Sequence, residues 1–452
     1  MTDRFDAIVV GAGISGLLSA LSLSKEGKKV LLIEGSSVLG GNCRTYEVDG
    51  FMVDTGCHAI THMDDGPLPR LMGKYFDFMP HLVPYGNYFV RSNDVFQEFP
   101  WTAQAWVKFR ILSRKDRLHL AQTIVSAVTT SGFRKQALNK SVFEYLSKNR
   151  FSDKTWRFID TFSYFMSGVS MYETPAWRML KGAKYLEDGE SPGVGRRFRG
   201  HVNKLIKMLR YKGSYHQAYP RKGIQSITDC VVNSFARGKV TVKTQERVNS
   251  IIVDGGRAFG VETGCGSYNG GFVVFSGYAK DLSSLAGKHL PPEYVKNLSR
   301  LRQSDSLTVW LGLERKYPKF NYGGSEVIFE GEAPFWAMPT SNLDPSLAPD
   351  GKQIVGFSSV VRGHWRNHKK NLMGAIYSTY PGLQKLVVME HTQHLVPEKA
   401  AISVDARFPE PESPIPGLYL VGTDTDTRSM GVTRAAFSVE NLLAALKKRG
   451  LV

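Results

Sequence analysis

The chain has 452 residues, of which 42% are hydrophobic and 22% charged; this composition excludes a disordered or fibrous protein and allows a core for two or three domains. Lys and Arg outnumber Asp and Glu by 58 to 41, for a net charge of +17, which favours anionic partners such as phosphates, phospholipid or nucleic acid. Four cysteines without a Cys-x-x-Cys pair predict no disulfide framework, no metal site and a reduced, cytoplasmic protein.

The first elements of the chain predict a dinucleotide-binding unit. Residues 5–10 form a β-rich apolar run, residues 14–26 have a helical pattern, and residues 30–33 form a second buried strand. The three glycines between the first strand and the helix allow a tight turn, the approach of a pyrophosphate and close packing of helix on strand. The predicted pyrophosphate-binding residues are Gly11, Ala12, Gly13, Ile14, Ser15 and Gly16.

An acidic residue and a second glycine turn extend this unit. Glu34 ends the second strand, 23 residues after Gly11, where a carboxylate accepts hydrogen bonds from ribose hydroxyls. A glycine turn beside an arginine follows, and its backbone donors and its cation suit a cofactor with a second polar half. The candidate cofactor-binding residues of this segment are Gly35, Gly40, Gly41, Asn42, Arg44 and Thr45.

Segments in the middle and at the end of the chain have a similar pattern. Four strands are predicted in the middle of the chain, at 240–242, 248–253, 258–263 and 271–275. A Gly-Gly hairpin turn follows the second of them. Near the C-terminus, a strand over 417–421, a Gly-x-Asp turn and a helix over 432–446 predict another phosphate- or ribityl-binding corner.

The segment from Glu34 to Thr45 resembles the flavin-containing amine oxidase superfamily, in which an E-x-x-x-x-x-G-G-x-x-x-T sequence contacts FAD. Most of the chain is similar to the bacterial-type phytoene desaturase and carotenoid isomerase branch of that superfamily. One departure is Lys222, which stands where the first glycine of a P-x-G-G helix entry is usual and leaves that turn in doubt.

The resemblance implies noncovalent FAD, because the C-terminal flavin segment lacks the cysteine that monoamine oxidases carry there. It also implies that Val248 packs near the adenine, with core packing as the alternative. At the C-terminal corner, a turn holds the ribityl-pyrophosphate and the start of a helix faces the flavin, through Gly422, Thr423, Asp424, Gly431, Val432 and Thr433.

Cofactor motifs at the start, middle and end of the chain must converge on one molecule. They predict an α/β fold with a discontinuous Rossmann-type FAD-binding domain built from residues 1–92, 218–290 and 405–452. An inserted α+β substrate domain is then expected from residues 93–217 and 291–404.

The resemblance implies an FAD-dependent oxidoreductase that desaturates, saturates or isomerises an apolar isoprenoid or carotenoid-like substrate by hydride exchange with flavin N5. A flavin amine oxidase, a protoporphyrinogen-type oxidase and a non-catalytic prenyl-binding protein are the alternatives. The sequence shows no obvious acid–base pair for catalysis. His58, near the flavin loop, is a candidate catalytic residue, with a purely structural role as the alternative. Without a second glycine fingerprint for NAD(P)H, quinone, oxygen or a diffusing carrier is the expected electron acceptor.

One segment is strongly basic. Residues 191–228 contain nine Lys or Arg and no Asp or Glu, interleaved with apolar residues that have helical spacing. Such a segment suits an anionic membrane surface, and a solvated basic face is the alternative. Nucleic acid is disfavoured because the chain has no nucleic-acid-binding module. The protein is therefore expected to be cytoplasmic and peripheral on a membrane.

Overall fold

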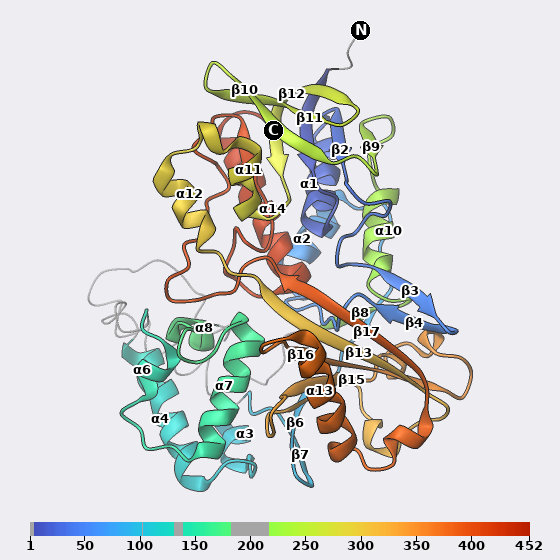
Figure 1. Cartoon of the computed structure of the whole chain (residues 1–452), viewed down its shortest axis with the longest axis vertical. Helices are drawn as coiled ribbons and strands as arrows, with labels where there is room; N and C mark the ends of the chain where they lie inside the picture. The colour runs from blue at the N-terminus through green and yellow to red at the C-terminus, as the bar shows by residue number, and fades with distance from the viewer. Residues whose placement is uncertain (1–3, 102, 131–138, 182–216) are drawn as a thin grey trace.

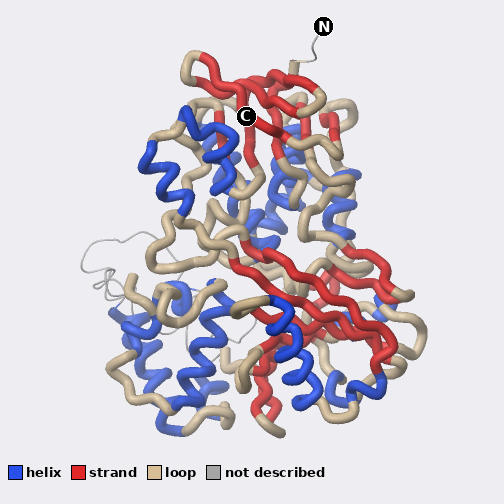
Figure 2. Tube along the Cα trace, in the orientation of Figure 1, coloured by secondary structure: helices blue, strands red, loops and turns tan. Residues whose placement is uncertain are grey.

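The computed structural model describes residues 4–101, 103–130, 139–181 and 217–452. A sheet flanked by helices forms one end of the molecule, and a second sheet and a group of helices form the other (Figure 1). The coloured trace shows that long strands of the second sheet run toward the centre, where the two ends meet (Figure 2). The predicted α/β class is confirmed.

The first sheet contains seven strands among the described residues, in the order β10-β11-β12-β1-β2-β9, with β18 beside β12. The neighbours β18, β12, β1, β2 and β9 are parallel, whereas β10, β11 and the start of β12 form an antiparallel meander. The strands are β1 (Phe5–Val10), β2 (Val30–Ile33), β9 (Val240–Lys243), β10 (Val248–Asp254), β11 (Arg257–Thr263), β12 (Gly266–Phe275) and β18 (Leu418–Leu420).

Helices cover both faces of this sheet, which explains why β1 and β2 are almost continuously apolar. One face packs against α1 (Ile14–Lys25), α2 (Pro67–Tyr75), α10 (Gln225–Asn233) and α14 (Gly431–Lys448). The other face packs against α11 (Leu282–Ala286) and α12 (Pro292–Ser299). The strands and helices predicted for the cofactor unit are therefore confirmed, within a few residues at their ends.

The second sheet has the order β17-β13-β16-β15-β14-β6-β7. On one face lies α13 (Trp365–Thr379), and the other face packs on Phe51 and Val53 of the small β3–β4 hairpin. The strands are β6 (Asn87–Ser92), β7 (Val95–Glu98), β13 (Ser304–Leu313), β14 (Gly324–Ile328), β15 (Phe335–Met338), β16 (Gln353–Val360) and β17 (Val387–Glu398).

The remaining elements complete the lower half of the molecule in Figure 1 and join it to the upper half. Two small sheets consist of β3 (Thr45–Val48) with β4 (Phe51–Asp54) and β5 (Leu82–Pro84) with β8 (Ala218–Pro220). The helical group consists of α3 (Ala103–Lys108), α4 (Arg114–Thr130), α6 (Val142–Leu146), α7 (Asp153–Ser167) and α8 (Ala176–Lys181).

The strand pairing differs from the predicted domain division at one boundary. Residues 1–92 are predicted to belong to the FAD-binding domain, yet β6 pairs in parallel with β14 inside the second sheet. β6 also pairs with β7 in an antiparallel hairpin, so both strands belong to the second sheet. The domain boundaries remain predictions.

A buried ion pair holds β6 in the second sheet. Arg91 Nε lies 2.6 Å from Oε2 of Glu326, whose side chain is fully buried. The second carboxylate oxygen of Glu326 accepts hydrogen bonds from the hydroxyls of Tyr322 at 3.0 Å and Tyr380 at 2.6 Å. The guanidinium of Arg91 also lies 4.5 Å from the ring centroid of Phe96. Burial raises the pKa of Glu326, so its charge depends on Arg91.

We expect Arg91→Met to destabilise the protein by about 3–5 kcal/mol, because it leaves a buried carboxylate without its counter-charge. Urea unfolding followed by tryptophan fluorescence measures the change. Arg362→Met is the matched control: its pair with Asp160, at 3.4 Å, is partly exposed, so a loss of at most about 1 kcal/mol is expected. Equal losses in the two variants would contradict the prediction.

Candidate cofactor site

The turn between β1 and α1 forms as the glycine spacing predicts. Gly11 has φ +96°, and a β-carbon on Gly16 would lie 1.9 Å from the carbonyl oxygen of Gly11, so the helix approaches the turn more closely than a side chain allows. A β-carbon on Gly13 would meet no atom within 4 Å, which leaves open space beside the N-terminus of α1. The amides of Ile14 and Ser15 have no acceptor within the helix, and such a helix start suits a diphosphate.

Glu34 lies directly beside this turn. Its Oε2 accepts a hydrogen bond from the backbone N–H of Ala12 at 2.7 Å, and its Oε1 accepts one from that of Ser36 at 2.8 Å. A carboxylate can accept more than two hydrogen bonds. The side chain is therefore fixed at the end of β2 and retains the capacity to accept from ribose hydroxyls.

The second glycine turn packs on the first. The backbone N–H of Gly40 donates to the carbonyl of Ala12 at 2.8 Å, and a β-carbon on Gly41 would lie 3.1 Å from Cα of Gly13. Both glycines have positive φ, +107° for Gly40 and +58° for Gly41, which favours glycine at these two positions. The two turns thus form a single backbone surface at the start of α1.

The side chains of Asn42 and Thr45 bind other parts of the protein. Asn42 Nδ2 donates to the carbonyl of Val396 in β17 at 2.7 Å. Thr45 Oγ1 donates to Oδ1 of Asp54 at 2.6 Å and accepts from the backbone N–H of Gln225 at 3.0 Å. Both side chains hold the loop in place, and their direct contact with a cofactor stays a prediction.

Asp54 connects β4 to the start of α10. The buried carboxylate accepts hydrogen bonds from the hydroxyl of Tyr219 at 2.6 Å and from the backbone N–H of Ile224 at 3.0 Å. The turn between them contains Lys222, which has φ +64° and whose N–H donates to Asp344 Oδ2 at 2.6 Å. This turn was in doubt because Lys222 stands where a glycine is usual. It is nevertheless formed, and the lysine adopts the positive φ that a glycine would adopt.

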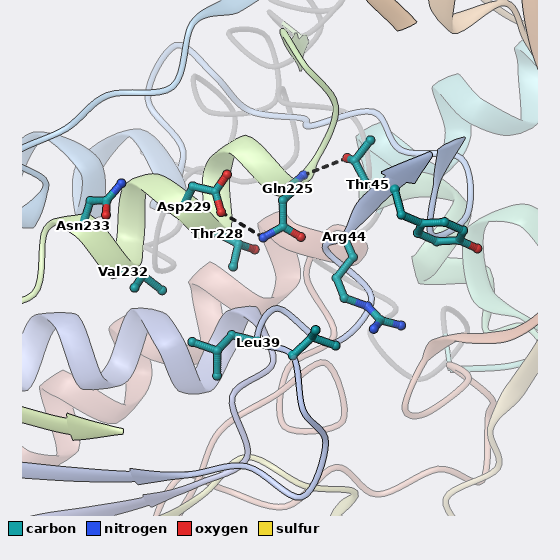
Figure 3. A pocket seen from close by; sticks show the side chains of 10 residues that line it. Leu39, Arg44, Thr45, Gln225, Thr228, Asp229, Val232 and Asn233 are labelled. Atoms are coloured by element: carbon teal, nitrogen blue, oxygen red, sulfur yellow. Dashed lines mark hydrogen bonds between the residues drawn. The ribbon is translucent and has the colours of Figure 1, made fainter. Parts of the chain in front are cut away.

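A pocket of about 760 Å³ opens between the second glycine loop and α10. Figure 3 shows it between Leu39 and Arg44 on the loop and Thr228, Asp229 and Val232 on the helix. Arg44 Nε is buried without a hydrogen-bond partner among the described residues. The Arg44 guanidinium therefore has a donor to offer an anionic ligand at this loop.

The C-terminal corner follows β18 as predicted. Gly422 has φ +150°, and Thr423 Oγ1 accepts the backbone N–H of Lys399 at 3.1 Å. Asp424 Oδ2 accepts the backbone N–H of Ala279 at 2.6 Å, while Oδ1 is buried and has no hydrogen-bond partner within the described residues. Burial raises the pKa of Asp424. A buried acceptor without a donor fits a ligand hydroxyl at this position.

One backbone amide at the start of α14 already binds a side chain of the protein. The backbone N–H of Gly431 donates to Oε1 of Glu398 at 2.6 Å, and Glu398 Oε2 lies 3.2 Å from Nη1 of Arg434. The amides of Val432 and Thr433 have no acceptor within the helix. We therefore expect these two amides, rather than that of Gly431, to face a ligand carbonyl.

Two further predicted residues have clear structural roles. Val248 is buried in the apolar cluster that includes Ile251 and Val261 of the meander. His58 Nε2 lies 2.7 Å from the carbonyl oxygen of Thr55, so one ring nitrogen is already used within the loop. An adenine contact by Val248 and a catalytic part for His58 stay predictions.

The predicted cofactor residues converge at one edge of the first sheet. Gly11, Glu34, Ser276 and Gly422 follow the neighbouring parallel strands β1, β2, β12 and β18, so residues from both ends of the chain meet at the carboxyl edge where such sheets bind ligands. The glycine surface, Glu34 and the free oxygen of Asp424 together fit the diphosphate, ribose and ribityl groups of FAD.

Three residues at this edge were not predicted from the sequence. Ser276 Oγ lies 3.0 Å from Ser15 Oγ at the start of α1, and Glu398 and Lys399 reach the edge from the end of β17. None belongs to a glycine motif. Only the position of Ser276, directly after the predicted strand at 271–275, was a usable signal.

Comparisons with known proteins identify the family of this chain. The chain matches the family of flavin containing amine oxidoreductases over residues 14–438. It is 25% identical to a prolycopene isomerase of Daucus carota, with 96% of this chain and 78% of that protein covered. It is 26% identical to an all-trans-retinol 13,14-reductase of Rattus norvegicus over 67% of this chain, which spans about half, 51%, of that relative.

A solved structure has the same fold. The crystal structure of an oxidoreductase from Methanosarcina mazei superimposes with a TM-score of 0.79 at 19% identity, covering 97% of this chain and 100% of that one. The likeness extends over both sheets and the helical group, since almost all of each chain is matched.

We expect Glu34→Ala to weaken FAD binding by about 1.5–3 kcal/mol, the range for a hydrogen bond to a charged group. Fluorescence titration of the apoprotein with FAD measures the loss. Acid precipitation should release all the flavin, since we expect noncovalent binding. Glu262→Ala on β11, whose carboxylate bonds Ser250 at an exposed position, is the control. Wild-type affinity in Glu34→Ala, or flavin that remains on the precipitated protein, would contradict the prediction.

Proposed function

Since the chain belongs to the flavin containing amine oxidoreductase family and is an FAD-dependent oxidoreductase, we propose that its substrate is an apolar isoprenoid, such as a carotenoid-like polyene. The reaction is a desaturation, saturation or isomerisation. When bound, FAD exchanges a hydride with a carbon atom of the substrate, a reaction that amino-acid side chains do not perform. The observation that carries the proposal is a set of aromatic side chains in the second unit.

Six described aromatic residues contact one another in a closed series, which we call the aromatic circuit. They come from β6, the segment after β7, the helix α7 and the strand β15. None of the six is fully buried. The ring-centroid distances are 5.8 Å for Tyr88–Trp101, 4.5 Å for Trp101–Phe99, 4.8 Å for Phe99–Phe162, 6.5 Å for Phe162–Phe165, 5.7 Å for Phe165–Trp336 and 5.2 Å for Trp336–Tyr88.

The chemistry of the aromatic circuit favours a flat, uncharged ligand. Aromatic faces pack on conjugated or aliphatic chains over a large area, with an offset-stacked or edge-on geometry. These properties support an apolar isoprenoid as the substrate.

The aromatic circuit is connected to the cofactor side of the molecule. Tyr85 packs on Tyr88 with ring centroids 5.5 Å apart, and it belongs to the buried cluster that includes Phe51 and Val53 of β4. That strand ends at Asp54, whose carboxylate anchors the turn into α10. Apolar packing thus extends from the circuit to β4, the strand that leads into the loop containing His58.

The names of the relatives agree with this substrate class. The prolycopene isomerase and the retinol reductase are named for isoprenoid polyenes, although at about one quarter identity they indicate a class of substrate rather than one compound. The non-catalytic alternative is disfavoured by the glycine surface and Glu34, since a protein that only binds prenyl groups has no use for a diphosphate-binding turn.

We expect isoprenoid polyenes, and not amines, to exchange electrons with the bound flavin. Under anaerobic conditions, a saturated isoprenoid should bleach the oxidised flavin absorbance, or a conjugated polyene should restore the absorbance of chemically reduced protein. Putrescine and a protoporphyrinogen are the comparison substrates. A flavin that responds to either of these, and to no isoprenoid, would refute the proposal.

A variant of the aromatic circuit makes the same experiment site-specific. Trp336→Ala should weaken binding of the responding isoprenoid by about 0.5–1.5 kcal/mol, which is twofold to tenfold, because it removes one aromatic packing partner. Trp365→Ala, at the start of α13 and outside the circuit, is the control and should leave the affinity for the isoprenoid unchanged. Both variants should bind FAD equally well.

We propose that the basic segment 191–228 brings the protein to anionic lipid, where an apolar substrate resides. Residues 191–216 lie outside the described residues, including the predicted helical stretch. In the described part of the chain, no helix is both long and apolar enough to cross a bilayer. The support is therefore the nine basic residues without an acidic one, each worth about 1 kcal/mol near an anionic surface.

Co-sedimentation with vesicles tests this. The protein should pellet with anionic but not neutral vesicles at low salt, and high salt should release it, because exposed charges are screened over about 8 Å at physiological ionic strength. The triple variant Arg196→Ser, Arg197→Ser, Arg199→Ser should bind less. Equal binding to both vesicle types, or no loss in the triple variant, would contradict it.

A further inference from the structure

Lys399 joins the second sheet to the cofactor edge of the first. It follows Glu398, the last residue of β17, yet its side chain enters the other unit. Its Nζ donates to the carbonyl of Ser276 at 2.5 Å and to that of Gly277 at 2.8 Å. A β-carbon on Gly422 would lie 2.9 Å from the same Nζ. The ammonium therefore lies where β12 and β18 end.

This position is next to the predicted diphosphate surface. A β-carbon on Gly11 would lie 3.3 Å from the carbonyl of Ser276, the same carbonyl that Lys399 binds, and Ser276 Oγ contacts Ser15 at the start of α1. One peptide group thus separates the ammonium from the glycine turn. Lys399 as a whole residue is partly buried.

The charges around the edge require a cation. Glu34 and Asp424 already place carboxylates there, and FAD adds a diphosphate. The carboxylates of Asp424, Asp281 and Glu34 all raise the pKa of Lys399, while desolvation, the larger effect, lowers it. Desolvating an ammonium is costly unless an anion compensates it. Two of its three N–H groups bind the carbonyls of Ser276 and Gly277, which leaves a third donor for an anion.

We propose that Lys399 binds the diphosphate of FAD, so that a residue from the end of β17 completes the cofactor site. The inference rests on FAD binding alone and is independent of the substrate proposed above. In this arrangement, the ammonium supplies charge to an oxyanion that the helix start and the glycine amides bind through dipoles. The second sheet thereby contributes directly to cofactor affinity.

Ligand fragments binding to the apoprotein separate a charge contact from a structural one. We expect Lys399→Met to weaken binding of FAD and of ADP about tenfold to a hundredfold, the loss of a charged hydrogen bond. Riboflavin, which has no phosphate, should bind both proteins equally. Lys399→Arg should retain most of the ADP affinity. Lys280→Met is the matched control, since Lys280 Nζ and Lys399 Nζ lie at similar distances, 5.7 Å and 5.9 Å, from the Tyr278 ring.

Other outcomes would overturn the proposal. If riboflavin loses as much affinity as ADP, Lys399 only supports the edge; if ADP binds Lys399→Met as it binds wild type, Lys399 does not reach the diphosphate. Should the methionine variant not fold, Lys399→Gln replaces it, because an amide still donates to the carbonyls of Ser276 and Gly277 without a charge. Thermal unfolding of each apoprotein identifies that case. Isothermal titration calorimetry gives the affinities.

Discussion

The contact between α1 and the turn after β1 is the constraint on which the cofactor site depends. Since a β-carbon on Gly16 would overlap the carbonyl oxygen of Gly11, the helix can start this close to the strand only with glycine there. The same approach places the second glycine turn against Gly13 and allows Glu34 to bind the amide of Ala12. Ser276, from the end of β12, contacts the same start of α1, so a later segment of the site packs against a surface that the first 41 residues form.

The two units are joined through charged and polar side chains at the centre of the molecule. Asn42 binds the carbonyl of Val396 in β17, and the next residues of the chain, Glu398 and Lys399, bind the start of α14 and the end of β12. Hydrogen bonds to fixed backbone groups allow little sliding, in contrast to apolar packing. A strand of the second sheet thus holds the parts of the cofactor site in one relative position.

Local patterns predicted the parts of the structure that depend on neighbours in sequence. The strands, α1, α14 and the glycine turns follow from apolar periodicity and glycine spacing, and all were confirmed. The pairing of β6 with β14 and the Arg91–Glu326 ion pair could not be predicted in this way, because the partners lie far apart in the sequence. Lys222 illustrates a different limit: a sequence cannot show that the surrounding hydrogen bonds stabilise a positive φ in a lysine.

The aromatic circuit and Lys399 were missed for the same physical reason, since each is formed by contacts between segments without a motif. At the C-terminal corner, Ser429 has φ +51°, and its carbonyl accepts hydrogen bonds from both Arg178 and Arg434. Burial and the adjacent Arg434 lower the pKa of Arg178 to about 9. Two adjacent buried cations are costly. The cost is offset because Arg434 pairs with Glu398 at 3.2 Å and Arg178 donates to the carbonyls of Thr427 and Ser429. Since Arg178 belongs to α8, these hydrogen bonds fix the helical group to the loop that precedes α14.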